Sequence, residues 1–344
     1  MIRFVTTKTN PYCLTVVQKY DYENYLCSLL LPDSRRNFAL ALRAFNVELA
    51  QICDRSENLA QAKYRFQFWR DIIEYLFDDN SNNSTPYHTP LERELKESVS
   101  GLTLSKQRFY QLINSRERYF NSFSFPTCKA AESYFDDAYV PIHCLLSEAY
   151  GFEMTSINPL LNHLGRAQGM VNMLRSSVLL AKHKNVLLFP LDLLNQYNLT
   201  QEHVLCFLRN NNNPSTTTTT TTTTIDSTSN EKSIQQLTHH IASLGHYHAK
   251  CVTQLSNELI HKSFITPTLK SIKLKEKDLQ QKYLLQNILP KLLLPLLPIN
   301  NYLNYLSYTV NFDLRLNEKF TNSLLPLQLC WNAWWNNVPK EPRA

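Results

Sequence analysis

The chain has 344 residues, a net charge of +6 and only five glycines. This length suits one large domain or two small ones. So few glycines nearly exclude the folds that hold phosphate on glycine-rich loops, and neither G-x-G-x-x-G nor G-x-x-x-x-G-K-S/T occurs. Abundant Leu, Gln, Lys and Glu favour helix, so the composition predicts an all-α protein.

The positive charge is mild and does not gather into the basic face that a nucleic-acid-binding protein presents. The longest basic cluster, Lys270 to Lys275, is followed at once by Glu276 and Asp278, as on a solvated helix face. We therefore expect no nucleic acid among the partners of this protein. The charge is compatible with contact to an anionic membrane surface.

Eight cysteines are spread along the chain, and no two of them have the C-x-x-C spacing of a zinc site. They are expected to be reduced thiols. Two histidines, His239 and His246, lie seven residues apart and can share one helix face. No cysteine or carboxylate joins them at ligand spacing, so we predict neither a metal site nor a cofactor.

Residues 1–10 form a short basic segment, and the first acidic residue of the chain is Asp21. Mitochondrial import signals are basic and poor in acids, so we interpret this segment as import-related, although it is shorter than such signals usually are. The longest apolar stretch, Leu284 to Leu306, is interrupted by prolines and a lysine. It is expected to lie in a core or against a membrane, not across one.

Residues 11–344 are predicted to form a single domain with a disordered insertion. The insertion, at 210–231, contains an Asn run and nine consecutive Thr residues and has nothing to bury. Helical patterning resumes after it, which favours a loop within one domain over a boundary between two domains. A shorter polar loop is expected at 78–90.

Two helices can be read from their apolar periodicity. The first is predicted to start after the segment Leu31-Pro32-Asp33-Ser34, where Asp33 or Ser34 can cap its free N–H groups. Its apolar residues recur at spacings of four and three, which places them in one stripe. This stripe consists of Phe38, Leu42, Phe45, Leu49 and Ile52.

The second helix has a longer stripe with the same spacing. Its members are Leu160, Leu164, Ala167, Val171, Leu174, Val178 and Ala181. Gly165 and Gly169 lie four residues apart, which predicts that another helix approaches closely there. The segments Asn10–Leu30 and Lys129–Tyr150 are each expected to form one further helix.

Both helices contain segments that resemble the signatures of a known family, and we call them the signature helices. The run Leu30–Asp54 is similar to the first signature of squalene and phytoene synthases, and Gly165–Leu194 is similar to the second. The resemblance implies an isoprenoid-synthase-like helical bundle around a central cavity. The enzymes of this family condense two prenyl diphosphates, and acids on two facing helices hold the Mg²⁺ ions that neutralise the leaving diphosphate.

The first signature departs from the enzymes at its metal-binding positions. Where they have D-D-x-x-D, this chain has Ala50, Gln51 and Asp54, so one acid of three is kept. Without paired acids at this position the Mg²⁺ ions lose ligands.

The second signature departs in the same way. Where the enzymes have Q-x-x-N-x-x-R-D-x-x-x-D, this chain keeps Asn172 and Arg175 but has Ser176 and Leu180 in place of the two acids and Gly169 in place of the Gln. Four of the five metal-binding acids are therefore absent, and we predict no catalytic residue and no metal site. Leu180 suggests that the pocket has partly closed.

The three residues that are kept, Asp54, Asn172 and Arg175, have two interpretations. They can line a residual pocket for a polar or phosphate-bearing ligand, or they can form structural hydrogen bonds. The sequence leaves both open, with structural bonding favoured.

Longer phrases resemble one branch of the family, the assembly factors of mitochondrial respiratory complex I (NADH dehydrogenase). They are Tyr12–Pro32, Leu42–Gln51, Phe66–Glu74, Gly165–Arg175 and Leu324–Trp335. The resemblance implies a non-catalytic protein, peripheral on the matrix side of the inner membrane, whose partners are complex I subunits, other assembly factors or an inner-membrane lipid. The alternatives are a divergent prenyltransferase of the squalene/phytoene type and a lipid-binding protein.

Overall fold

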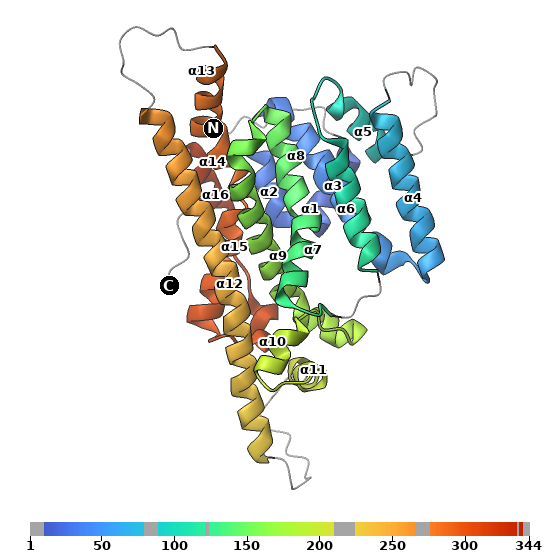
Figure 1. Ribbon diagram of the computed structural model, residues 1–344, viewed down its shortest axis with the longest axis vertical. Coiled ribbons are helices and arrows are strands. Elements are labelled where there is room, and N and C mark those ends of the chain that lie inside the picture. The colour runs from blue at the N-terminus through green and yellow to red at the C-terminus, as the bar shows by residue number, and fades with distance from the viewer. Residues whose placement is uncertain are drawn as a thin grey trace.

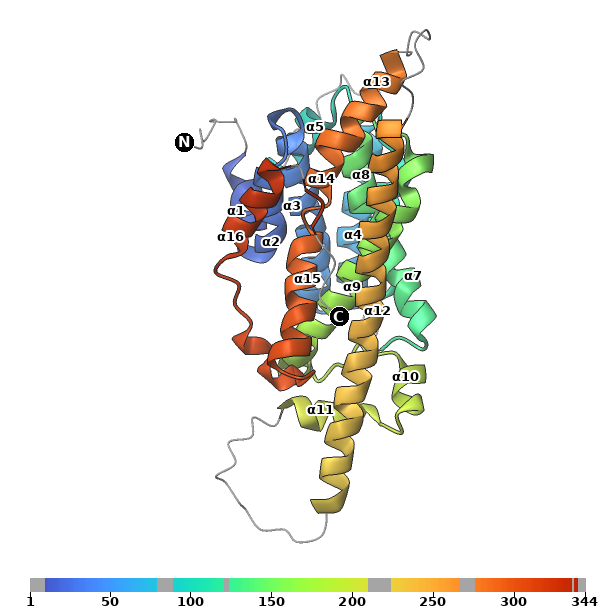
Figure 2. The ribbon, with the colours of Figure 1, turned by 90° about the vertical axis from the view of Figure 1, so that its left-hand side faces the viewer.

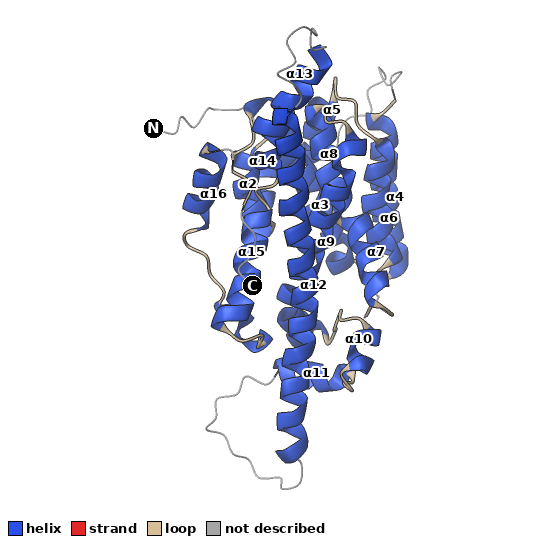
Figure 3. Cartoon of the chain, turned by 60° about the vertical axis from the view of Figure 1, so that its left-hand side comes forward, coloured by secondary structure: helices blue, strands red, loops and turns tan. Residues whose placement is uncertain are grey.

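The computed structural model describes residues 10–78, 89–120, 124–209, 224–265, 276–335 and 337–339. In this part of the chain all regular secondary structure is helical, which confirms the predicted all-α class (Figure 3). The α-helices are α1 (Pro11–Tyr20), α2 (Tyr22–Leu29), α3 (Asp33–Arg55), α4 (Leu59–Leu76), α5 (Pro90–Val99), α6 (Lys106–Arg118), α7 (Cys128–Ala138), α8 (Val140–Tyr150), α9 (Met154–Lys184), α10 (Leu191–Gln196), α11 (Gln201–Arg209), α12 (Thr224–Ile265), α13 (Glu276–Tyr283), α14 (Leu289–Leu292), α15 (Leu296–Asn304) and α16 (Leu325–Trp334). The π-helical segments are η1 (Leu284–Ile288) and η2 (Tyr305–Thr309), and the 3₁₀-helix is η3 (Leu314–Lys319).

Two helices, α3 and α9, organise the packing. Helix α9 contacts α7, α8, α11, α12 and α15, while α3 contacts α1, α2, α4, α5, α6 and α8. In Figure 1, α12 runs along one side of the bundle and α4 lies at the opposite side. Figure 2 shows α16 beside α2, on the side away from α7 and α10. The two signature helices are thus enclosed by the remaining helices.

The apolar stripes explain why α3 and α9 lie inside. Every member of both predicted stripes is buried, with at most 4% of any residue exposed. Burying one side chain of this kind contributes about 1.5–3 kcal/mol relative to leaving it exposed. The stripes therefore drive both helices into one core, as their periodicity predicts.

Helix α9 meets two neighbours at its glycines, as predicted. A Cβ on Gly165 would lie 2.5 Å from Val140 Cγ2 and 2.9 Å from Val140 N, at the start of α8. A Cβ on Gly169 would overlap the ring of Phe135 in α7. Only residues without a side chain permit this approach.

The segment Asn10–Leu30 forms two helices, where the sequence predicts one. The backbone breaks at Asp21, whose φ of −144° and ψ of 53° are not helical. Its N–H donates to Val17 O at 2.8 Å and ends α1, and its carbonyl accepts from Tyr25 N at 2.8 Å and begins α2. One residue therefore satisfies the backbone on both sides of the break.

The segment Lys129–Tyr150 also divides, at Tyr139, into α7 and α8. Pro141 lies in the first turn of α8, where a missing N–H needs no partner. In a continuous helix the same proline would clash with the carbonyl four residues earlier. The prediction of a single helix is wrong for this reason.

The predicted cap of α3 is wrong as well. The helix begins at Asp33 itself, Pro32 is the N-cap residue, and no side chain bonds the free N–H groups. Asp33 pairs instead with Arg36 at 2.6 Å, and Arg36 Nη2 donates to Leu31 O at 2.9 Å. The side chain that could have capped the helix is drawn into a salt bridge one turn further on.

Part of the predicted insertion at 210–231 lies outside the described residues, which resume at 224. From Thr224 the chain is helical as α12, so 224–231 forms the first turns of that helix where the sequence predicts a loop. Residues 1–9 and most of the loop at 78–90 lie outside the described residues too. Among the described helices, none combines the length and the apolar character that crossing a membrane requires.

The glycine contact leads to a prediction on stability. Gly165→Ala is expected to lower the free energy of unfolding by about 2 kcal/mol, because the new methyl group would overlap backbone atoms of Val140. The matched control is Gly245→Ala in α12, whose Cβ would meet Met170 Cβ at 3.4 Å. There the gain in helix propensity, up to about 1 kcal/mol, offsets the tighter contact. Urea denaturation compares the two variants, and equal stabilities would contradict the close approach of α8 to α9.

Candidate functional site

Three adjoining cavities lie around α3 and α9, and we call them the central cavities. The first, of about 450 Å³, lies between α2, α9 and the start of α15. The second, of about 310 Å³, lies between α3 and α9, and the third, of about 230 Å³, lies beside α6 and α7. The lining residues shared by the first two are Tyr20, Asp21, Asn24, Gln168 and Asn172. Ala50, Asp54 and Arg116 line both the second and the third.

The first degenerate motif faces these cavities. Ala50, Gln51 and Asp54 of α3 all line the second cavity. Asp54 is 60% exposed, and its carboxylate accepts a hydrogen bond from Lys184 Nζ at the end of α9. Such an exposed pair contributes at most about 1 kcal/mol. The single acid that the motif keeps is thus paired with a cation from the second signature helix.

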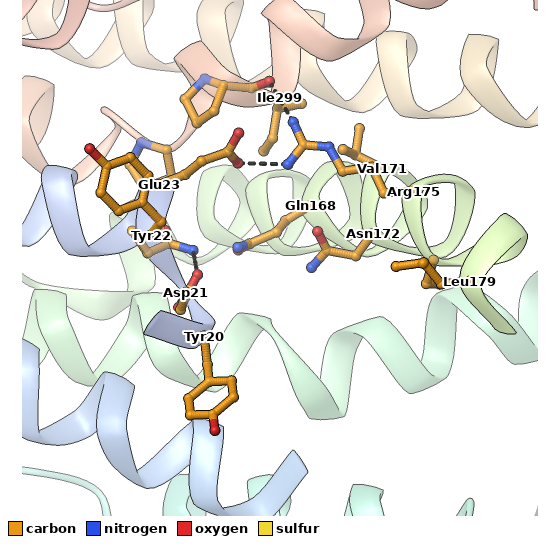
Figure 4. Close-up of a pocket in the computed structure, with 14 residues that line it drawn as sticks. Tyr20, Asp21, Tyr22, Glu23, Gln168, Val171, Asn172, Arg175, Leu179 and Ile299 are labelled. Carbon is orange, nitrogen blue, oxygen red and sulfur yellow. Dashed lines mark hydrogen bonds and ion pairs between the residues drawn. The ribbon is translucent and has the colours of Figure 1, made fainter. Parts of the chain in front are cut away.

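The second degenerate motif faces the first cavity from the opposite side. Asn172, Arg175 and Ser176 of α9 line it, and Asn172 also lines the second cavity. Figure 4 shows Gln168, Asn172 and Arg175 along one side of α9, toward the residues that join α1 to α2. The structure therefore brings the surviving motif residues of both signatures to one connected space.

Two positions of the second motif lie elsewhere. Gly169 faces the ring of Phe135, which occupies the place of any side chain there. Leu180 is half-buried and is not among the residues that line the central cavities. Its neighbour Leu179 lines the first cavity instead. Leu180 therefore does not close the cavities, whereas Leu179 contributes to the wall of the first one.

Arg175 is held through both terminal nitrogens and the face of its guanidinium group. Its Nη1 donates to Glu23 Oε2 at 2.6 Å and its Nη2 to the Pro298 carbonyl at 3.4 Å (Figure 4). The guanidinium carbon lies 4.6 Å from the ring centre of Tyr302 and 5.3 Å from that of Phe320, within cation–π range. Arg175 thereby ties α9 to α2 and α15.

A buried ion pair lies where the first two cavities meet. Arg43 of α3 has 3% of its side chain exposed, and its Nη1 lies 3.9 Å from Asp21 Oδ2. Burial raises the pKa of Asp21 and lowers that of Arg43, and the attraction between the two groups opposes both shifts. Asn24 Nδ2 also donates to Asp21 Oδ1 at 2.8 Å. The break between α1 and α2 is thus anchored to α3.

Three arginines around the central cavities share one property. In Arg43, Arg116 and Arg175 the Nε atom is buried and has no hydrogen-bond partner. A buried donor without a partner costs about 1–3 kcal/mol.

The residues around the cavities do not fit a cluster of Mg²⁺ ions, which takes several carboxylate oxygens from facing helices. Three carboxylates line the cavities, and each already pairs with a basic side chain. The pairs are Asp21–Arg43, Glu23–Arg175 and Asp54–Lys184. Across the described residues, no group of three His, Cys, Asp or Glu is placed to hold a metal ion. We derive no chemical step through a metal.

Several cavity residues carry no motif in the sequence. Arg43 offers a signal, because it stands within the apolar run ALALRAF, where a charge needs a buried partner. Asp21, Glu23 and Arg116 offer none. Their position depends on the break at Asp21 and on how α6 packs against α3.

Comparison with known proteins identifies the class. Residues 17–219 match the squalene/phytoene synthase family, and the chain belongs to this family. A dehydrosqualene synthase in complex with ligand superposes with a TM-score of 0.61 at 15% identity, covering 95% of each chain. A squalene synthase from Alicyclobacillus acidocaldarius superposes with a TM-score of 0.57 at 14% identity, covering 86% of this chain and 92% of that one. At these identities the two structures show the fold alone, and they confirm the isoprenoid-synthase-like bundle.

Curated relatives with higher sequence identity to this chain are described as complex I assembly factors. A Drosophila melanogaster protein, "NADH dehydrogenase (ubiquinone) complex I, assembly factor 6 homolog", is 32% identical over 249 residues, which cover 72% of this chain and 68% of that protein. The Bos taurus "NADH dehydrogenase (ubiquinone) complex I, assembly factor 6" is 30% identical over 256 residues, 74% and 69% of the two chains. The Homo sapiens protein of that description is 31% identical over 242 residues, 70% and 65%. The resemblance to the assembly-factor branch is thereby confirmed.

A buried histidine beside the cavities gives a pH-dependent prediction. His143 is 3% exposed, its Nε2 lies 2.9 Å from Gln168 Oε1, and burial, followed by the charge of Arg43, lowers its pKa to about 3. Between about pH 6.5 and pH 3 the unfolded chain binds this proton and the folded chain does not, so the stability falls as the pH falls. The slope from one such group is at most about 1.4 kcal/mol per pH unit.

Substituting this histidine isolates its effect. His143→Asn is expected to flatten the decline in unfolding free energy between pH 6.5 and pH 4, compared with the wild type. The exposed His183→Asn is the matched control and should leave the decline unchanged. Denaturation curves at stepped pH measure all three proteins, and parallel profiles for His143→Asn and the wild type would show that His143 is not buried in its neutral form.

Proposed function

We propose that this protein is a non-catalytic assembly factor for mitochondrial respiratory complex I, which acts by binding on a degenerate prenyl-synthase scaffold. The observation that carries the proposal is the state of the central cavities. Ala50, Gln51 and Ser176 face them where acids would be needed, and every carboxylate in the lining is paired with a cation. The descriptions of the curated relatives support the connection to complex I.

A scaffold of this kind acts through its shape and its surfaces. The ion pairs tie α2, α3, α9 and the start of α15 together, so the body is rigid without a bound metal. Such a body can hold a complex I subunit or another assembly factor while that partner is incorporated. No bond in a substrate is made or broken in this role.

Retention of a polar or phosphate-bearing lipid is a second candidate function. The first cavity, of about 450 Å³, is within the range of small-molecule sites. Arg175 and Asn172 line this cavity, and Arg43 and Arg116 line the adjoining second cavity, so the basic side chains favour an anionic group. Lipid binding and assembly work are compatible, since a bound lipid can stabilise the scaffold.

The proposed location is the matrix face of the inner membrane, with α16 as the contact. Leu327, Trp331, Trp334 and Trp335 are between 59% and 82% exposed on one side of this segment. The other side packs on α2, on Leu294 and on Leu297 at the start of α15. Tryptophan is favoured at membrane–water interfaces, and residues 324–335 carry no charge that would oppose insertion there. The positive net charge of the chain favours a surface of anionic lipid.

The assembly role is tested in cells that lack the protein. Native gels are expected to show selective loss of complex I, with the other respiratory complexes intact. Asp54→Ala is expected to restore complex I to the wild-type level, because the exposed Asp54–Lys184 pair contributes little to stability. Normal complex I in the deleted cells would refute the role, and failure of Asp54→Ala at normal abundance would contradict the non-catalytic mechanism. Turnover of a prenyl diphosphate with Mg²⁺ by the pure protein would favour the prenyltransferase alternative.

The membrane contact is tested by vesicle co-sedimentation. Trp331→Ser combined with Trp334→Ser is expected to reduce binding to phosphatidylcholine vesicles containing cardiolipin by about tenfold or more, because two large apolar rings are removed. Tyr64→Ser is the matched control, since Tyr64 is 79% exposed but lies on α4. Equal binding of the double variant and the control would exclude α16 as the contact.

A further inference from the structure

A groove of about 410 Å³ lies between α12 and the segment 303–312, apart from the central cavities. We call it the α12 groove, and none of its lining residues lines a central cavity. From α12 it takes His239, Ala242, Ser243, His246, Tyr247 and Lys250, which recur at helical spacing on one face. From the other wall it takes Leu303, Ser307 and Phe312. All of these residues lie beyond 17–219, the part of the chain that matches the enzyme family.

The backbone of the second wall is unusual. Ser307 belongs to the π-helical segment η2, and Asn311 and Phe312 both have positive φ, of 46° and 61°. A left-handed conformation at a phenylalanine is costly and is found where the surroundings demand it. Phe312 N donates to Leu306 O at 2.8 Å, and its ring meets the His239 ring edge-on with 4.7 Å between ring centres. This geometry holds the Phe312 ring at one end of the groove as an apolar wall.

The other end of the groove is basic. Lys250 lies there, one helical turn from His246 on the same face of α12. Lys250 forms no ion pair within the described chain, and no carboxylate is among the groove's lining residues. The nearest acid along the second wall, Asp313, accepts hydrogen bonds from Arg315, with 2.8 Å to Arg315 Nη2. The charge of Lys250 is therefore not neutralised by a carboxylate in the groove lining.

Between the two ends the floor is apolar, formed by Ala242 and Leu303. A volume of about 410 Å³ is that of a small-molecule site and is too small for a protein helix with its side chains. From this arrangement we propose that the α12 groove binds a single-headed amphiphile. Its oxyanion, a carboxylate or a phosphate, bonds to Lys250, and its apolar chain runs along Ala242 and Leu303 to Phe312. This proposal is independent of the role in complex I.

The test uses the purified full chain and four probes in titration calorimetry. Decanoate and decyl phosphate carry the two oxyanions on one chain length, decanol lacks the charge, and inorganic phosphate lacks the chain. Decanoate or decyl phosphate is expected to bind at least tenfold more tightly than both decanol and inorganic phosphate. Whichever of the two binds more tightly identifies the head group.

Variants connect the binding to the groove. Lys250→Gln is expected to weaken binding of the charged amphiphile about tenfold and to leave decanol unchanged. Ser243→Trp, at an exposed position on the groove face, is expected to abolish binding by filling the groove. Lys232→Gln is the matched control, an exposed lysine on the same helix outside the groove. Circular dichroism confirms that each variant is folded.

Three results would overturn the proposal. The first is the absence of binding by both amphiphiles, and the second is equal affinity for decanol and the charged probes. The third is an affinity of Lys250→Gln or Ser243→Trp equal to that of Lys232→Gln, which would place the ligand elsewhere, for instance in the central cavities. Each result is measured on the purified protein, so it does not depend on whether the chain acts in the assembly of complex I.

Discussion

The contact of α9 with α7 and α8 is the constraint on which the rest of the bundle depends. At Gly165 and Gly169 the backbone of α9 lies directly against Val140 and Phe135. Two such contacts one turn apart fix the rotation of α9 about its own axis, since any other rotation would place side chains in the interface. This rotation directs Asn172 and Arg175 toward α2 and α3. The central cavities thus owe their composition to a contact on another face of the same helix.

The electrostatics of the cavities follow from that placement. In this chain the acids come from the α1–α2 segment and from the end of α3, and each meets a basic side chain from another helix. The pairs join elements that are far apart in the sequence. They compensate the charge of the acids inside the bundle, as bound metal ions would otherwise do. A family fold without its metal acids therefore remains a well-defined body.

Periodicity and resemblance predict much of this from the sequence, for physical reasons. The stripes of α3 and α9 are buried because apolar residues at helical spacing must share a face, and the motif positions follow from the helices that carry them. The break at Asp21 has no such signal, because neither Gly nor Pro marks it and its partner Arg43 lies in another helix. The start of α3 depends on a salt bridge that competes with a cap. The left-handed conformation of Phe312 has no signal either, because neither Gly nor Asn marks that position.

The start of α15 is shared by two parts of the molecule. Pro295, Pro298 and Ile299 line the first central cavity, while Leu294 belongs to the buried cluster under α16 and Leu297 packs against it. One short helix therefore has the cavity on one side and the tryptophan-bearing segment on the other. Any event that displaces it on one side changes the environment on the other, and thermodynamic linkage makes the effect reciprocal. A ligand in the first cavity and a partner against α16 would therefore both act on this one helix.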